Sequence, residues 1–203
     1  NLYGKDTIIW SADSQCILFD LTDTREASLE YRVNYVPING SKRPQYTETK
    51  MPLAGDKSVI THQLYVVNVN TGDLLAPNYP KMPLPTYGCI AIGFLTTGLG
   101  WWSGDNKRVF FVDLPRDARS VRIIEWNTQS NGIRVILEEA DNIAVRLCHE
   151  TFENPLIVPL PETDDLVWFS ERSGWGHLYL YDLNNGELKH QITGVAANSG
   201  GEP

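Results

Sequence analysis

The sequence lacks the features that mark a disulfide scaffold, a zinc-binding module or a membrane-spanning helix. Its 203 residues contain 3 cysteines, Cys16, Cys89 and Cys148, which lie far apart and form no CxxC pair. So sparse and odd a set argues against a disulfide framework and a cysteine zinc site, and we expect buried thiols. The longest apolar run, residues 89–95, is far shorter than the ~20 residues that a membrane helix needs. We therefore expect no membrane segment in this chain.

Runs of basic residues are also missing, and 17 Lys and Arg stand against 25 Asp and Glu, a net charge of -8. This balance repels polyanions, so we expect no nucleic-acid partner and an acidic, soluble surface. No signal peptide is visible, and the chain begins with Asn1 rather than Met. We therefore expect a fragment or a processed chain, which leaves its compartment open between the cytoplasm and the periplasm or exterior.

Helical periodicity is scarce, and short β-rich runs bounded by Gly, Asn, Asp and Pro dominate the chain. Many short strands with turn residues between them predict an all-β sandwich, barrel or propeller. The expected strands cover residues 7–10, 16–21, 31–37, 63–69, 90–95, 108–114, 121–126, 133–137, 166–170 and 177–182.

A weak internal repeat favours the propeller. Trp10-Ser-Ala-Asp13-Ser and Trp102-Ser-Gly-Asp105-Asn each precede a strand, as does Thr163-Asp-Asp. Each Asp stands where a turn needs a side chain that bonds its own backbone. A second, Gly-containing turn follows each unit, at intervals slightly longer than the ~40–50 residues of a four-stranded blade. We therefore expect blades at 6–77, 89–139 and 144–193, the first with an insertion at 39–62.

Each expected blade is a four-stranded antiparallel sheet with apolar residues on both faces, because its neighbours cover both. The continuous run Val109-Phe-Phe-Val112 fits this better than strict alternation does. We expect about three to four blades, and three cannot close a ring of the roughly 4–8 blades that propellers have. The prediction is thus a partial β-propeller, which either belongs to a larger propeller or exposes its end blades.

Three segments carry a resemblance to a known family. The Trp10 turn resembles the Trp-Ser-Pro-Asp-Gly turn of dipeptidyl peptidase IV-like enzymes, and Leu53-Ala-Gly-Asp56 resembles the end of their proline-rich segment. The most specific match is residues 170–182, Ser-Glu-Arg-Ser-Gly-Trp-Gly-His-Leu-Tyr-Leu-Tyr-Asp. The resemblance covers about residues 7 to 193. The chain therefore resembles the N-terminal β-propeller of a dipeptidyl peptidase IV-like member of the prolyl oligopeptidase family of serine peptidases.

This resemblance implies a parent enzyme in which a propeller covers an α/β-hydrolase domain. The parent would release N-terminal Xaa-Pro or Xaa-Ala dipeptides with a Ser-Asp-His triad of the hydrolase domain and no cofactor. The propeller would act as a gate and scaffold. The implied partners are the hydrolase domain of the same parent chain, peptide substrates, and a second copy of the protein. Family members pair through a propeller arm, and the insertion at 39–62 is the candidate.

No catalytic, substrate-binding or metal-binding residue is expected in this chain. An α/β-hydrolase presents its serine in a Gly-x-Ser-x-Gly elbow, and the sequence has none. The family's Glu-Glu pair, which grips the substrate ammonium, lies upstream of the Trp10 turn, where this chain has no Glu. The four histidines lack the i,i+4 spacing of a helical metal site.

The residues that carry the motifs are interpreted as blade architecture: Trp10, Asp13, Trp102, Asp105, Glu171, Arg172, Gly174, Trp175 and His177. Trp175 is expected to cap the apolar seam between blades, and His177 to pack or hydrogen-bond within its blade. The alternatives are a recognition role for Trp175 and a domain-interface role for His177. We expect Glu171 and Arg172 to form a surface ion pair, and Glu138-Glu139 to be solvated charge at a strand edge.

A second function from another class stays open at this point: a stand-alone propeller that serves as a scaffold for protein binding. It would need repeats of similar length and a ring that closes, which the unequal units and the insertion disfavour. A Gly-x-Ser-x-Gly elbow downstream of this segment in the complete gene would favour the peptidase.

Overall fold

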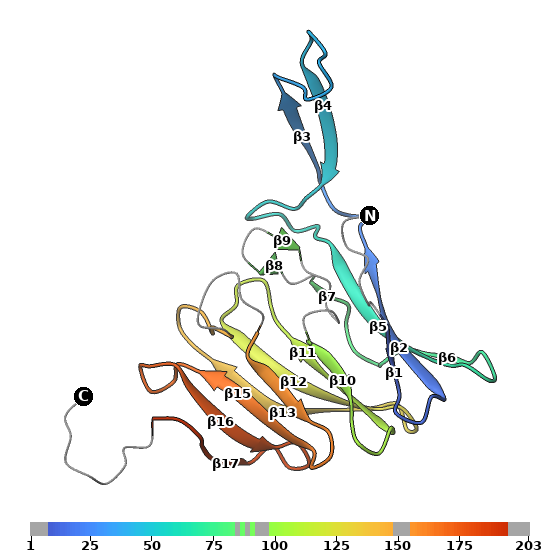
Figure 1. Ribbon diagram of the computed structural model, residues 1–203, viewed down its shortest axis with the longest axis vertical. Helices are drawn as coiled ribbons and strands as arrows, with labels where there is room; N and C mark the ends of the chain where they lie inside the picture. The colour runs from blue at the N-terminus through green and yellow to red at the C-terminus, as the bar shows by residue number, and fades with distance from the viewer. Residues whose placement is uncertain (1–7, 84–85, 88–89, 92–97, 148–154, 195–203) are drawn as a thin grey trace.

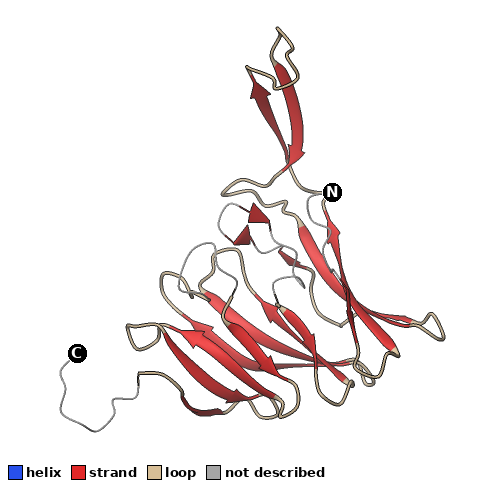
Figure 2. Cartoon of the chain, viewed as in Figure 1, coloured by secondary structure: helices blue, strands red, loops and turns tan. Residues whose placement is uncertain are grey.

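The chain folds into a row of β-sheets, and every regular element of its described part is a strand (Figure 1, Figure 2). The computed structural model describes residues 8–83, 86–87, 90–91, 98–147 and 155–194. Three sheets are propeller blades and follow one another along the chain, and two short hairpins accompany the first. The predicted all-β, partial-propeller fold is confirmed.

The second and third blades are four-stranded antiparallel sheets whose strands lie in chain order. The second contains β10 (Gly100–Trp102), β11 (Arg108–Asp113), β12 (Ser120–Asn127) and β13 (Gly132–Ala140). The third contains β14 (Ile157–Leu160), β15 (Asp165–Ser170), β16 (His177–Asp182) and β17 (Leu188–Gln191). Among the described residues, each of these two blades is therefore formed by four consecutive strands.

The first blade contains β1 (Ile8–Trp10), β2 (Cys16–Asp23), β5 (Thr61–Asn68) and β6 (Leu74–Leu75) in that order. A further short strand, β7 (Met82–Pro83), pairs with the other end of β5. The hairpin of β8 (Thr86–Tyr87) and β9 (Ile90–Ala91) follows. The expected strand at 90–95 is thus described only at its start, because residues 92–97 lie outside the described part, as do Cys89, Cys148 and His149.

One expected blade strand lies elsewhere. Residues 31–37 were predicted to join the first blade, but β3 (Leu29–Asn34) pairs only with β4 (Gln45–Lys50) in a hairpin. This hairpin, here called the arm, projects away from the blades (Figure 1). The excursion between β2 and β5 thus begins before residue 39, because β2 finds its partner in β5. Local alternation in residues 31–37 could not reveal which strand would pair with it.

The second blade is buried on both faces, which explains its continuous apolar run. Along β11, Phe110 and Val112 point toward the third blade, and Val109 and Phe111 point toward the first. All of these side chains are 0% exposed. Leu18 and Leu64 from the first blade, and Leu166 and Trp168 from the third, complete one continuous core. The two outer faces of the row are open, with Trp10 51% and Val158 48% exposed.

Candidate functional site: the seams between blades

In the first and second blades, the first two strands are joined by the same turn, which is built around a serine and an aspartate. The Ser11 hydroxyl donates to Asp13 Oδ1 at 2.6 Å, and the Ser103 hydroxyl donates to Asp105 Oδ1 at 2.5 Å. Each Asp Oδ1 also accepts the backbone N–H two residues later, at 3.0 Å. The bond from Ser11 is the main cause that lowers the pKa of Asp13. The aspartates Asp13 and Asp105 therefore close turns and are held by them.

Residues in the left-handed conformation at these turns join each blade to the next. Asn106 has φ 58°, and its Oδ1 accepts the Ala12 N–H of the first blade at 2.8 Å. Asp164 has φ 51°, and its Oδ1 accepts the Gly104 N–H of the second blade at 3.4 Å. A Cβ on Gly104 would lie 2.2 Å from the Pro161 carbonyl oxygen, so the approach of the two turns requires glycine.

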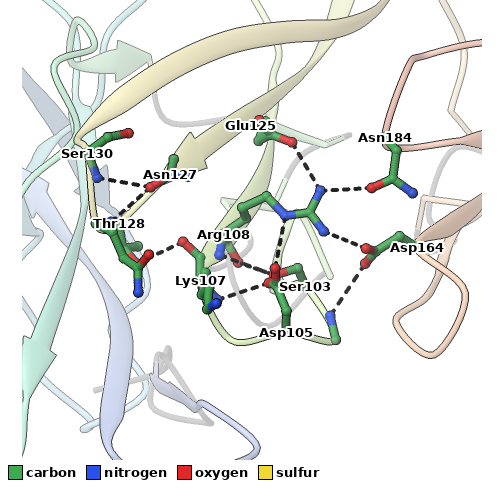
Figure 3. Close-up of polar contacts among 12 residues, drawn as sticks. Ser103, Asp105, Lys107, Arg108, Glu125, Asn127, Thr128, Ser130, Asp164 and Asn184 are labelled. Carbon is green, nitrogen blue, oxygen red and sulfur yellow. Dashed lines mark hydrogen bonds and ion pairs between the residues drawn. The ribbon is translucent and has the colours of Figure 1, made fainter.

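The interface between the second and third blades, here called the second seam, has a polar network at this end. Its centre is Arg108, the first residue of β11 (Figure 3). Its guanidinium donates to Asp164 Oδ2 at 2.5 Å and to Asn184 Oδ1 at 3.1 Å, both in the third blade. It also pairs with Glu125 of its own blade at 3.3 Å. The Arg108 side chain is only 14% exposed. The Arg108 network thus joins three segments of two blades in a largely desolvated place.

Glu139 is the centre of a second network, at the opposite end of the same strands. Its carboxylate accepts Trp168 Nε1–H at 2.7 Å, the Ser170 hydroxyl at 2.6 Å and Arg172 Nη2–H at 2.7 Å. All three donors belong to the third blade or its β15–β16 turn. The Glu139 side chain is 14% exposed, so the expectation of solvated edge charge is wrong for Glu139, whereas Glu138 is exposed. The third blade buries Glu139 of β13, and the sequence of β13 alone does not predict this burial.

Arg172 does not pair with its neighbour Glu171, contrary to the sequence-based expectation. Glu171 instead pairs with Arg146 at 3.4 Å. The Arg172 guanidinium stacks over the Tyr179 ring, 4.4 Å from its centroid, and donates to the Tyr181 hydroxyl. The two adjacent side chains thus have separate partners: Glu171 pairs with a residue that precedes β14, and Arg172 reaches β16. Residues 170–182, the most specific sequence motif, thus contain side chains that bind the third blade to Glu139 of the second blade.

The remaining motif residues lie around these seams. Trp102 is buried, and its Nε1–H donates to the Ile9 carbonyl at 3.2 Å across the interface between the first and second blades, here called the first seam. Gly174 has φ 93° in the β15–β16 turn. His177 is half-buried, its Nδ1 lying 3.4 Å from the Thr193 hydroxyl. Trp175 is 79% exposed, so it covers neither of the seams between the three described blades.

The first seam has its own polar anchor at the end of β11. The Tyr79 hydroxyl donates to Asp113 Oδ2 at 2.7 Å, and Arg122 pairs with the same oxygen at 2.8 Å. Burial, followed by the bond to Asp113, raises the pKa of Tyr79 to about 12. Tyr79 also meets the Phe111 ring edge-on. Tyr79 therefore remains a neutral donor at physiological pH.

These networks are suited to holding blades together. The hydroxyls of Ser11, Ser103 and Ser170 each donate to a carboxylate that serves a turn or a seam. Within the described ranges, no group of three or more His, Cys, Asp or Glu residues could hold a metal ion. The same ranges contain no helix long and apolar enough to cross a membrane. The described polar networks thus close turns and join neighbouring blades.

The family model of the dipeptidyl peptidase IV N-terminal region matches residues 2–199. The chain belongs to this family. The match covers the three blades, the arm and both polar networks of the second seam. It agrees with the resemblance that residues 170–182 carry most specifically.

Solved structures of similar fold support the architecture. A candidate dipeptidyl aminopeptidase IV from Bacteroides ovatus is 20% identical, with a TM-score of 0.64 over 89% of this chain and 23% of its own. Dipeptidyl peptidase 4 from Porphyromonas gingivalis is 19% identical, with a TM-score of 0.68 over 94% of this chain and 24% of its own. At these identities the likeness shows the fold, and the chain spans less than a quarter of either structure.

Sequence reasoning missed the residues that build the seams. The sequence does not single out Arg108, it predicts solvated edge charge at Glu139, and it indicates Asp164 only as a turn residue. A signal exists only for the turns: Asn106 and Asp164 occupy matching places after the first strand of their blades, and Asn and Asp tolerate the left-handed conformation. No comparable signal marks Glu139.

Proposed function

We propose that this chain is the non-catalytic propeller segment of a dipeptidyl peptidase IV-like serine exopeptidase, in which it acts as gate and scaffold. The match of the family model to residues 2–199 carries this proposal. The polar networks at both ends of the second seam support it, because they hold two blades in one orientation. The sequence also has no Gly-x-Ser-x-Gly elbow.

The partner in this proposal is the α/β-hydrolase domain of the same parent, which would supply the triad and cleave Xaa-Pro or Xaa-Ala from peptide N-termini. The propeller would restrict which peptides reach that triad. A gate of this kind depends on blades that do not part, and Arg108 and Glu139 oppose parting at both ends of the strands. A stand-alone binding scaffold remains the rival.

The gating role is tested in the full-length parent protein with Arg108→Ala and the exposed control Lys42→Ala. We expect Arg108→Ala to raise cleavage of a long polypeptide relative to cleavage of a Gly-Pro chromogenic substrate, because a loosened seam admits larger molecules. Lys42→Ala should leave this ratio unchanged. Equal changes toward both substrates in Arg108→Ala would contradict the gate. Cleavage of the Gly-Pro substrate by the purified 203-residue chain, lost on mutating one serine, would contradict the non-catalytic assignment.

We further propose that the arm pairs two copies of the parent. Register places Leu29, Tyr31, Val33 and Tyr46 on one face of the arm, with the charged residues Glu48 and Lys50 on the same face toward the end of β4. Arg32 and Thr47 lie on the other face. The apolar side chains of the first face are all exposed. A two-stranded hairpin is at best marginally stable alone, so an apolar face in the open fits a second arm.

The pairing is tested by the molar mass of the full-length protein in solution, measured by light scattering. Tyr46→Glu is expected to convert dimer to monomer, because it removes an aromatic ring and places a charge directly opposite Val33 in the apolar part of this face. Thr47→Glu, at the adjacent position of the opposite face, is the matched control and should remain dimeric. A monomeric wild-type protein, or equal effects of both variants, would overturn this proposal without touching the gate.

A further inference from the structure

The chain contains three Asn-Gly pairs in described turns, and the structure holds them very differently. They are Asn39-Gly40 in the arm, Asn131-Gly132 in the second blade and Asn185-Gly186 in the third. Glycine leaves the following backbone nitrogen unhindered and conformationally free, which exposes the asparagine side chain to attack by that nitrogen. Asparagine is for this reason among the thermolabile residues. Local sequence alone would treat the three pairs alike.

The pair in the second blade is held by the core. Asn131 Oδ1 accepts Nε1–H of the fully buried Trp126 at 2.8 Å. Gly132 begins β13 and lies in register with Asn127 of β12. The side-chain carbonyl and the neighbouring backbone are both engaged, so bringing the Gly132 nitrogen to Asn131 Cγ requires the strand end to open.

The pair in the third blade is held by the seam. Both ends of the Asn185 amide contact Glu187, at 2.9 Å to its N–H and 3.1 Å to its Oε2. The Gly186 N–H donates to the Asp182 carbonyl at 2.8 Å. A Cβ on Gly186 would lie 2.1 Å from the Ile136 carbonyl oxygen of the second blade. The turn is thus packed against β13 and cannot rearrange by itself.

Asn39 has none of this support. Its amide makes only the longer contacts with Ser41 N–H at 3.2 Å in the same exposed turn and with Oε1 of Gln45, the exposed first residue of β4, at 3.5 Å. The Gly40 N–H reaches the Pro37 carbonyl at 3.2 Å, and a Cβ on Gly40 would meet nothing within 4 Å. The turn lies at the far end of the arm from the blades (Figure 1), and the adjacent Ile38 is fully exposed. Opening it disturbs no core packing.

We propose that Asn39 is a site of spontaneous covalent modification, at which Asn39-Gly40 deamidates while the two other pairs are protected by the fold. The Gly40 nitrogen loses its proton and forms a bond to Asn39 Cγ, and the side-chain nitrogen leaves as ammonia. Water then adds to the five-membered imide and opens it to aspartate or isoaspartate. The step requires no reactant beyond water, and it adds one negative charge beside Lys42 and Arg43. This inference is independent of the proposed function.

The test follows the three sites in one sample of the intact chain. The protein is incubated in mildly alkaline buffer, and tryptic peptides are analysed by mass spectrometry over time. Cleavage at Lys and Arg places the three pairs in separate peptides, 33–42, 123–134 and 173–189. We expect acid to accumulate at Asn39 at least about tenfold faster than at Asn131 or Asn185, because only the latter need local unfolding. Comparable rates at the three sites in the folded chain would overturn the proposal.

Two controls separate the fold from the local sequence. In denaturant the three pairs should react at similar rates; a tenfold spread that persists there would place the cause in local sequence and overturn the structural argument. Asn39→Gln removes the reactive side chain and should abolish the change in peptide 33–42 without affecting the far-ultraviolet spectrum of the chain. Acid that still accumulated in that peptide would place the modification at Asn34 instead and overturn the proposal.

Discussion

The second blade and the arm are both built from antiparallel strands rich in aromatic and β-branched residues, but they differ in what covers them. In the second blade, Phe110 and Phe111 point to opposite faces and are both fully buried. In the arm, Tyr31 and Tyr46 lie on one face and are 61% and 69% exposed. The second blade thus derives its stability from neighbours on both sides, whereas the arm is held mainly by the pairing of its own two strands and leaves one face uncovered. Substitutions should therefore cost much in the blades and little in the arm.

The largest effect is expected where a buried side chain serves both core and seam. Trp168→Ala removes a fully buried indole and the donor to Glu139. We expect a loss of about 4 kcal/mol in the free energy of unfolding, measured by urea denaturation of the chain. Trp175→Ala, in the exposed turn beside it, is the control and should change this free energy little. Similar losses in both variants would contradict the described packing.

The Glu139 network provides the next test of the second seam. Glu139→Ala leaves Trp168, Ser170 and Arg172 without their shared acceptor in a largely buried place. We expect a destabilisation of about 3 kcal/mol, because the fully buried donors of Trp168 and Ser170 lose their acceptor. Glu138→Ala, one residue away and exposed, should have almost no effect. A loss at Glu139 no larger than at Glu138 would restore the solvated-edge interpretation.

The first seam should weaken in acid because of His62. The side chain is 1% exposed, and burial lowers its pKa from 6.5 to about 4. The unfolded chain therefore binds more protons in this interval, so stability is full above pH 6.5 and is lost as the pH falls toward 4. The expected loss is about 2 to 3 kcal/mol. Asp20, on the same face of the first blade, offsets part of it, because burial raises its pKa.

This loss is measured by urea denaturation at several pH values. His62→Leu should flatten the dependence between pH 4 and 6.5, whereas His190→Gln in the exposed β17 should leave it intact. An unchanged pH dependence in His62→Leu would assign the effect to other groups.

A smaller effect is expected at the close approach of the two turns. Gly104→Ala would place a Cβ 2.2 Å from the Pro161 carbonyl oxygen, so the second and third blades must shift apart. We expect about 2 kcal/mol of destabilisation by urea denaturation. Gly132→Ala is a milder control, because its Cβ would meet only the flexible Ser130 hydroxyl at 3.1 Å. Equal effects at both positions would mean that the seam tolerates separation at Gly104.

The smallest effect is expected in the arm. Tyr46→Ala removes an aromatic ring that is already largely in solvent, so the free energy of unfolding of the chain should change by less than about 0.5 kcal/mol. The same substitution in a blade, Tyr179→Ala, should cost several times more because that ring is buried under Arg172. An arm variant as costly as the blade variant would show that the arm packs on the blades.

Much of the architecture could be predicted because it follows from local rules. Asp13, Asp105 and the Asn-Gly turns mark strand ends through bonds to their own backbone, and Val109 to Val112 reveal two-sided burial by the absence of alternation. The partners of Glu139 could not be predicted, since they lie 29 or more residues away along the chain. For the same reason the sequence of residues 31–37 does not distinguish a blade strand from a strand of the arm; the pairing of β2 with β5 decides this.

By itself the sequence determined the all-β class, the repeating turns and the family, because each depends on residues close together in the chain. The tertiary structure alone decided that Glu139 is a buried acceptor, that Arg172 bonds across a seam, that Trp175 faces solvent, and that the arm stands apart from the blades. These properties depend on which segments meet. The residues of a strand indicate whether each of its faces is buried or exposed to solvent. Which segment covers a buried face is determined only by the packing of strands that are distant in the chain.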